Sequence, residues 1–281
     1  MKILVTGGAG FVGTNLIRFL KASNKNDIYS IDNYSIGSKK NHIDGVKYIE
    51  DNVINIQNYV NNYDIIYHLA ALSRIQPSFS NPDLIFDSNT NGTLKVLEFA
   101  KKNNSKVIYS GSSSMHHDPS LSPYAMTKYL GEQLCKLYKF SFDLEVDIVR
   151  FYNVYGPYEI LEGEWAAVIG KWRNQIKNDL PITIVGDGNQ RRDFTHINDI
   201  VDGLVKISSK KSKKYIWELG SGKNYSINEV YELFYKKFKC KRIYIDDQKG
   251  NYRETLREND DALDELNWEP KGDLEDYINN L

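Results

Sequence analysis

The first thirteen residues constrain the fold of this chain more than any other stretch. A short apolar run, Ile3–Val5, ends in a cluster of glycines at Gly7, Gly8, Gly10 and Gly13, and apolar residues with helical spacing follow. This order predicts a strand, a tight turn and a helix. Without a Cβ at Gly10, backbone can approach a pyrophosphate, and without one at Gly13 the helix can pack closely on the strand. The stretch therefore predicts a dinucleotide-binding turn.

An acidic residue supports the same interpretation. A second apolar run, Ile28–Ile31, ends in Asp32, about 20 residues after the last glycine, where a dinucleotide-binding fold places its ribose-binding acid. A carboxylate there accepts hydrogen bonds from both ribose hydroxyls and repels a 2′-phosphate, which favours NAD over NADP. The alternative is an ordinary turn followed by a surface aspartate.

Composition excludes several classes of function. The 281 residues can bury a sizeable core, as one large domain or two closely joined ones. With 36 basic and 37 acidic residues, the net charge of −1 suggests no nucleic-acid or anionic-membrane partner. Apolar runs are too short for a signal peptide or a membrane span. Cys135 and Cys240 predict neither a metal site nor a disulfide framework, so we expect a cytoplasmic protein without a bound metal.

Strand-like runs alternate with helical patterns through the first 150 residues. After the opening unit, the strand-like runs are 28–31, 46–49, 64–67, 106–109 and 145–149. Longer helical patterns cover about 82–102 and 123–140. This alternation predicts an α/β fold with a Rossmann-type, doubly wound parallel sheet and ligands at the carboxyl ends of its strands. The two long amphipathic helices predict either a homodimer interface or a simple cover for the sheet.

The pattern changes after Arg150. Shorter mixed elements follow, with strands expected at about 182–185, 215–219 and 242–245, and helices from about 198 and at 228–238, 260–266 and 274–278. We therefore predict an NAD-binding Rossmann domain over residues 1–150. Residues 151–281 are expected to form mainly a smaller, partly interleaved substrate lobe, with some segments returning to the first sheet.

The strongest local signal for chemistry is the pair Tyr124 and Lys128. Four residues apart on a predicted helix, they share one face. A free phenol has a pKa of about 10, which the Lys128 ammonium and a positively charged nicotinamide would lower toward neutrality. The serine cluster 110–114 follows a predicted strand and offers a hydroxyl partner to the tyrosine. Surface positions for the pair, and a plain serine-rich turn, are the alternatives.

Together these motifs resemble the extended short-chain dehydrogenase/reductase family, in its nucleotide-sugar epimerase/dehydratase branch, over nearly the whole chain. The matching segments are 6–13, 32–37, 51–52, 68–71, 89–92, 124–128, 150–157 and 186–194. The resemblance implies that Tyr124 is the base, Ser112 its hydroxyl partner and Lys128 the residue that lowers its pKa. It also implies that substrate is bound by Ser112, Ser113, Asn153, Arg192 and Thr255.

The same resemblance implies a set of NAD-binding residues. They are Gly7, Gly10, Phe11, Val12, Gly13, Asp32, Asn33, Ser35, Gly37, Asp51, Asn52, Leu69, Ala70, Ala71, Asn89, Tyr124, Lys128 and Tyr152.

Two positions after Ser112 discriminate among the reactions of this branch. Its dehydratases carry an Asp-Glu pair there, and related decarboxylases carry a nearby glutamate. Here Ser113 and Ser114 occupy those positions, and serine hydroxyls are neither acids nor bases near neutral pH. The serines favour hydride chemistry without elimination. At the position of Thr255, relatives carry either a bulky tyrosine or a small residue, and the resemblance associates the small residue with room for an N-acetyl group.

Three departures from the family pattern stand out. Gln248 occupies the place of a phosphate-binding arginine, which Lys249 or Arg253 would have to replace. His116 and His117 stand where Tyr-Gly is usual. The chain is also shorter than typical relatives, which predicts a reduced cover over the pocket.

We predict an NAD-dependent nucleotide-sugar epimerase, similar to UDP-glucose 4-epimerases. It would invert C4 of a UDP-hexose or UDP-N-acetylhexosamine through a transient 4-keto sugar. One alternative is a nucleotide-sugar dehydrogenase or reductase that releases its reduced cofactor, and another is a non-catalytic NAD-binding regulator.

Overall fold

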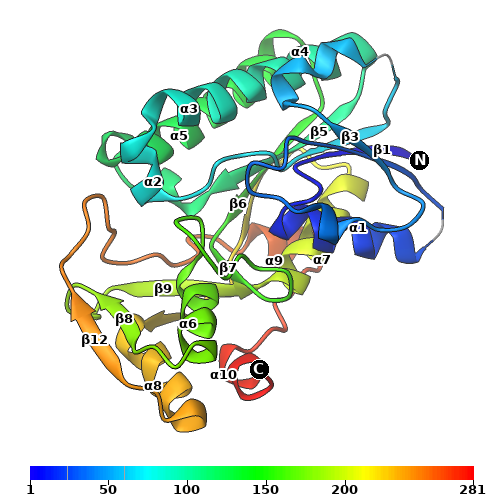
Figure 1. The fold of residues 1–281 in the computed structure, drawn as a ribbon. Helices are drawn as coiled ribbons and strands as arrows, with labels where there is room; N and C mark the ends of the chain where they lie inside the picture. The colour runs from blue at the N-terminus through cyan, green and yellow to red at the C-terminus, as the bar shows by residue number, and fades with distance from the viewer. Residues whose placement is uncertain (24, 60) are drawn as a thin grey trace.

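The computed structural model describes residues 1–23, 25–59 and 61–281. Within these ranges, seven parallel strands form one sheet in the order β10-β6-β5-β4-β1-β2-β3 (Figure 1). The strands are β1 (Lys2–Thr6), β2 (Asp27–Asp32), β3 (Lys47–Glu50), β4 (Ile65–His68), β5 (Lys106–Ser112), β6 (Val146–Phe151) and β10 (Ile216–Leu219). The predicted Rossmann-type parallel sheet is confirmed. Its order reverses between β1 and β4, where such folds bind ligands.

Helices cover both faces of this sheet (Figure 1). One face is covered by α1 (Phe11–Ala22), α7 (Ile197–Ser209) and α9 (Asp261–Leu266), which share a single apolar core. The opposite face packs against α4 (Gly92–Asn103) and α5 (Pro123–Ser141). The helix expected over 82–102 begins at Pro82 but is interrupted: α3 (Pro82–Phe86) joins α4 through a π-helical turn, Asp87–Asn91.

A smaller unit forms beside the sheet (Figure 1). It contains a three-stranded sheet of β7 (Asn153–Tyr155), β9 (Arg191–His196) and β11 (Asn224–Ser226), and a two-stranded sheet of β8 (Ile182–Val185) and β12 (Arg242–Ile245). Its helices are α6 (Val168–Lys177), α8 (Ile227–Phe238) and α10 (Leu274–Asn279). Although β10 lies after residue 150, it pairs with β6 in the large sheet. The domain boundary at residue 150 stays a prediction.

Several short elements escaped the sequence patterns, among them β7, β9, β11, α6 and α2 (Ile75–Ser80). Most of them are too short to show a clear apolar period, so neighbouring chain decides their conformation. In the described part of the chain, no helix is both long and apolar enough to cross a membrane.

The turn after β1 leaves no room for side chains. Gly7 has a φ of +72°, and a Cβ there would lie 2.8 Å from the Ala70 backbone nitrogen. A Cβ at Gly13 would lie 2.2 Å from the Gly7 carbonyl oxygen, because α1 packs directly on the turn. Gly10 is the N-cap of α1 and gives it no side-chain hydrogen bond, so N–H groups of the first helical turn stay open.

We expect Gly13→Ala to destabilise the fold strongly. Its Cβ meets backbone that cannot rotate away, so the free energy of unfolding should fall by about 3 kcal/mol in urea denaturation. Gly10→Ala is the matched control, because its Cβ would meet nothing closer than 3.3 Å. Equal stability of the two variants would contradict this packing argument.

Candidate active site

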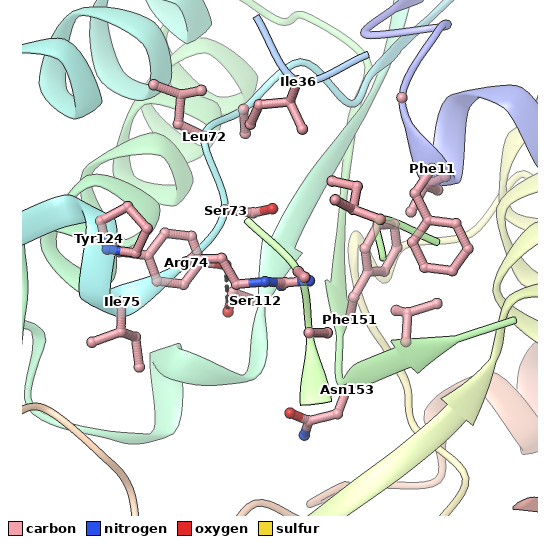
Figure 2. Close-up of a pocket in the computed structure, with 18 of the residues that line it drawn as sticks. Phe11, Ile36, Leu72, Ser73, Arg74, Ile75, Ser112, Tyr124, Phe151 and Asn153 are labelled. Carbon is pink, nitrogen blue, oxygen red and sulfur yellow. Dashed lines mark hydrogen bonds between the residues drawn. The ribbon is translucent and has the colours of Figure 1, made fainter. Parts of the chain in front are cut away.

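One cavity of about 920 Å³ lies at the carboxyl ends of the large sheet's strands and extends into the smaller unit (Figure 2). Its lining includes the turn after β1, the last residue of β2, the segment after β4 and the last residue of β5. The smaller unit contributes residues of β7, α6, β8 and β9. The volume lies in the upper part of the range for ligand cavities.

All but one of the predicted site residues line this cavity. Those lining it are Gly7, Gly10, Phe11, Val12, Gly13, Asp32, Asn33, Ser35, Gly37, Asp51, Asn52, Leu69, Ala70, Ala71, Ser112, Ser113, Tyr124, Lys128, Tyr152, Asn153, Arg192 and Thr255. They come from segments up to 248 residues apart, between Gly7 and Thr255.

Asn89 is the exception, because the structure buries it behind the cavity wall. Its side-chain oxygen accepts a hydrogen bond from the Leu72 N–H at 2.8 Å, and its side-chain nitrogen donates to the Leu72 carbonyl and to Thr127 Oγ1. Asn89 therefore ties the segment after β4 to α5. It positions the cavity wall, and its predicted contact with NAD stays a prediction.

The half of the cavity nearest β1 and β2 fits a dinucleotide. The Asp32 carboxylate is held in place by the N–H groups of Ala9 at 2.9 Å and Tyr34 at 2.8 Å, and burial raises its pKa. The Asp51 carboxylate accepts hydrogen bonds from Tyr59 and Asn55, which lower its pKa. With the open N–H groups of α1 beside them, these residues provide a ribose acceptor and a phosphate cradle.

The predicted catalytic residues meet in the other half of the cavity. Ser122 caps α5 by accepting a hydrogen bond from the Ala125 N–H, which places Tyr124 in the first helical turn and Lys128 one turn later. The Tyr124 hydroxyl donates to Ser112 Oγ at 3.3 Å (Figure 2). Lys128 Nζ donates to the Ser110 carbonyl at 2.8 Å.

The charges that act on Tyr124 in the structure differ from those that the sequence predicts. Burial raises the pKa of Tyr124, while the Ser112 hydrogen bond and the charge of Arg74 oppose that rise. Burial also lowers the pKa of Lys128 to about 8. The described cation whose charge acts on the phenol is therefore Arg74, which no sequence motif had marked. The predicted action of Lys128 on Tyr124 stays a prediction.

The substrate-side residues form a second group at β7 and β9. Asn153 Nδ2 donates to Thr255 Oγ1 at 3.0 Å, and Arg192 Nη2 donates to Asn251 Oδ1 at 2.6 Å. Burial lowers the pKa of Arg192 to about 10, so its charge is only weakly compensated by the protein. The Tyr152 ring lines the cavity, but its hydroxyl donates to the buried Glu218 at 2.8 Å.

Neither of the two cations near Gln248 takes the place of the phosphate-binding arginine that the family pattern predicts there. Gln248 lines the cavity, whereas neither Lys249 nor Arg253 is among its lining residues. Arg253 is committed to Asp187, with an Nη2 to Oδ2 distance of 3.0 Å.

The two histidines that depart from the family pattern support the cavity from outside. His116 contacts Glu218 at 2.6 Å and Glu258 at 2.9 Å, within a buried charge network that includes Arg150. His117 stacks on Tyr252, with ring centroids 4.0 Å apart, and Tyr252 lines the cavity. These contacts assign both histidines packing and hydrogen-bonding roles.

Among the cavity residues that sequence patterns missed are Arg74, Glu159 and Tyr252. Arg74 follows β4, so the rule that ligands bind at strand carboxyl ends could have marked it. Glu159 and Tyr252 lie in irregular segments, where no spacing indicates which way a side chain points.

Known proteins resemble this chain in both sequence and fold. A family model described as the NAD dependent epimerase/dehydratase family matches residues 3–220. The chain belongs to that family. This confirms the resemblance seen in the sequence motifs and makes the protein a member of an NAD-dependent enzyme family.

Curated members of the epimerase/dehydratase family align over almost the whole chain. The chain is 34% identical to a UDP-glucuronate 4-epimerase of Thermodesulfobacterium geofontis, over 98% of this chain and 93% of the relative. It is 31% identical to a putative UDP-glucose 4-epimerase of Methanocaldococcus jannaschii, over 98% and 95%.

Solved structures of the family superpose closely. The UDP-glucuronic acid 4-epimerase of Bacillus cereus, in complex with UDP-glucuronic acid and NAD, matches with a TM-score of 0.90 and 28% identity, covering 99% of this chain and 96% of that chain. The UDP-glucose 4-epimerase of Thermotoga maritima with UDP-glucose gives a TM-score of 0.92 and 25% identity, with the same coverage.

His68 lies just behind the catalytic cluster, at the end of β4. Its ring nitrogens contact Thr6 Oγ1 at 2.8 Å and Thr93 Oγ1 at 3.0 Å. Burial, and then the charge of Lys128, lower the pKa of His68 from 6.5 to about 3. The imidazole is therefore neutral in the folded protein at physiological pH.

This buried imidazole should make the fold acid-sensitive. The unfolded chain takes up a proton at His68 below pH 6.5, whereas the folded chain does so only near pH 3. Stability is therefore lost as pH falls through this window, by about 2 to 3 kcal/mol at pH 4.5. Urea unfolding of His68→Gln should show a shallower pH dependence than wild type between pH 6.5 and 4.5. The same substitution at exposed His42 should retain the wild-type slope.

Proposed function

We propose that this protein is an NAD-dependent UDP-sugar epimerase that inverts C4 through a transient 4-keto intermediate. The observation that carries the proposal is the Tyr124–Ser112 hydrogen bond in the cavity, with serines at positions 113 and 114. Support comes from relatives at 31% and 34% identity that are named as UDP-sugar 4-epimerases.

The residues present fit NAD at the glycine turn, Asp32 and Asp51. Held by these residues, NAD would supply the hydride acceptor and donor that inversion at C4 requires. In this proposal the Arg74 charge, the Ser112 hydrogen bond and a positively charged nicotinamide together offset the burial that raises the pKa of Tyr124, so that Tyr124 accepts the O4 proton as a phenolate. Ser112 orients the reacting hydroxyl. The Lys128 ammonium adds positive charge behind this site. On return, Tyr124 gives the proton back, so the reaction is redox-neutral.

Serines 113 and 114 restrict what happens to the 4-keto intermediate. Elimination needs an acid for the leaving hydroxyl and a base for C5, and neither serine can supply them near neutral pH. The 4-keto intermediate is therefore reduced again at C4 by return of the hydride. Asn153 and Arg192 bind the substrate diphosphate in this proposal, with Arg192 as a forked, charged donor.

Incubation of the NAD-loaded protein with UDP-glucose, UDP-galactose, UDP-glucuronate and UDP-N-acetylglucosamine tests the proposal. Proton NMR should show one C4 epimer converting into the other without net accumulation of NADH. Steady growth of NADH absorbance would instead identify a dehydrogenase. A protein that binds NAD and converts no UDP-sugar would contradict the enzymatic proposal altogether.

Tyr124→Phe removes the proposed base, so kcat for epimerisation should fall by about 10³-fold. Binding of NAD, measured by calorimetry, should change little because the ring remains. Tyr129→Phe, on an exposed part of the same helix, is the control and should keep full activity. An active Tyr124→Phe enzyme would rule out the phenol as the base.

We also propose that the enzyme is a homodimer that works in the cytoplasm. Tyr129, Leu137 and Phe140 lie on one face of α5 and are 37, 49 and 65% exposed, and Leu84 of the neighbouring α3 is 55% exposed. Apolar side chains at this spacing on a long helix favour an interface between two copies. Both cysteines are free, as suits a reducing compartment.

A double substitution tests the dimer. Leu137→Glu with Phe140→Glu should shift the mass in analytical ultracentrifugation from two chains to one, because like charges would face each other across the interface. Leu180→Glu should leave the mass unchanged, because Leu180 is 55% exposed, between Leu137 and Phe140, but lies on the smaller unit. A monomeric wild-type protein would refute the homodimer.

A further inference from the structure

Arg74 is an unpaired cation inside the cavity. Its side chain extends into the cavity from the segment after β4 (Figure 2). Among the residues that the structure describes, its guanidinium makes one hydrogen bond, from Nε to the Trp165 carbonyl at 3.0 Å, and has no carboxylate within ion-pair distance. This bond fixes the guanidinium plane and leaves both terminal nitrogens available to a ligand.

Nearby charges do not cancel that of Arg74. Glu159 is the acidic group whose charge acts on Arg74, but its Oε1 is paired with Arg173 Nη1 at 2.7 Å. The three groups together keep a net charge of +1 beside the cavity. Arg74 is half-buried, points into the cavity and makes no ion pair within the described chain, so its charge is available to an anionic ligand.

The location of Arg74 indicates which anion would reach it. Tyr124 is near enough for its charge to act on Arg74, and α2, which follows Arg74 directly, packs against α5. The proposed diphosphate ligands Asn153 and Arg192 belong instead to β7 and β9 of the smaller unit. When O4 of a hexose lies at Tyr124, the neighbouring ring carbons are C3 and C5. Only C5 bears a carbon, C6, that can carry an acidic group.

A hydroxyl in the cavity lining is also without a partner in the described chain. Ser114 lines the cavity, is 3% exposed, and its buried Oγ makes no hydrogen bond within the described chain. Carboxylates accept several hydrogen bonds at once, including a two-point contact with a guanidinium. Ser114 is therefore a further hydrogen-bond donor that the cavity offers to an acidic group, beside the guanidinium of Arg74.

We infer that Arg74 is a specificity-determining residue that binds a C6 carboxylate, so that the preferred substrate is a nucleoside-diphosphate hexuronate. The inference rests on the proposed C4 epimerase function and narrows its substrate class. Neutral hexoses would leave the guanidinium without a counter-charge. Bond changes stay those of epimerisation: C4–H and O4–H break and re-form, and the carboxylate remains intact.

Paired kinetics on UDP-glucuronate and UDP-glucose, which differ only at C6, test Arg74. We expect the wild-type kcat/KM to be higher for UDP-glucuronate. Arg74→Met should lower the kcat/KM ratio of UDP-glucuronate to UDP-glucose by about 10- to 100-fold, because a charge-assisted contact is lost. The kcat/KM ratio of Arg74→Lys should fall between those of wild type and Arg74→Met, since lysine keeps the positive charge but lacks the two-pronged guanidinium.

Arg192→Met is the matched control. Arg192 is a second arginine in the cavity, and the proposed function places it at the diphosphate, which UDP-glucuronate and UDP-glucose have in common. This substitution should lower kcat/KM for both sugars and leave their ratio unchanged. A wild-type preference for UDP-glucose, or an equal loss for both sugars in Arg74→Met, would overturn the inference while the epimerase proposal stands.

Binding measurements test the Arg74 inference even if the proposed epimerase function is wrong. If the protein epimerises neither sugar, calorimetry on the NAD-loaded protein still compares the two ligands. Tighter binding of UDP-glucuronate in wild type, lost in Arg74→Met, supports the carboxylate contact. Equal affinities in both proteins refute it.

Discussion

The close contact between β1 and α1 is the constraint on which the rest of this structure depends. A side chain at Gly13 would collide with the Gly7 carbonyl, so the helix lies against the turn only because glycines occupy both places. That contact directs the open N–H groups of α1 into the cavity and places β1 at the switch point of the sheet. The nucleotide half of the site is therefore a consequence of backbone packing and needs few specialised side chains.

The reacting half depends on buried polar groups instead. Lys128 has a pKa of about 8 and His68 one of about 3, both lowered mainly by burial. Each is fixed by hydrogen bonds to neighbouring strands or helices, to Ser110 in one case and to two threonines in the other. Such groups keep their orientation without solvent, and this suits a site in which a phenol must exchange a proton repeatedly. Arg74 is less buried than these two groups and makes no ion pair within the described chain, so its charge stays open to the anionic ligand proposed above.

Membership in the epimerase/dehydratase family accounts for the shared framework, and the departures indicate what is particular to this chain. Gln248 lines the cavity where the family resemblance predicts a phosphate-binding arginine, and the charge of Arg74 acts on Tyr124. His116 and His117, unusual by sequence, support the cavity through Glu218 and Tyr252. The features that distinguish the chain thus lie on the substrate side, and the dinucleotide side follows the common pattern.

The sequence by itself determined the parallel sheet and its cofactor turn, because glycine spacing and strand periodicity are local signals, and it predicted Ser112, Tyr124 and Lys128 as residues of one site, which the structure brings into one cavity. It could not show that Asn89 lies behind the wall, since burial arises from contacts with Leu72 and Thr127, which are distant in sequence. Nor could it orient Arg74, whose direction is fixed by a hydrogen bond to Trp165, 91 residues later. Tertiary structure alone decided which charges share the cavity, because electrostatic energy depends on distance and burial in space and not on separation along the chain.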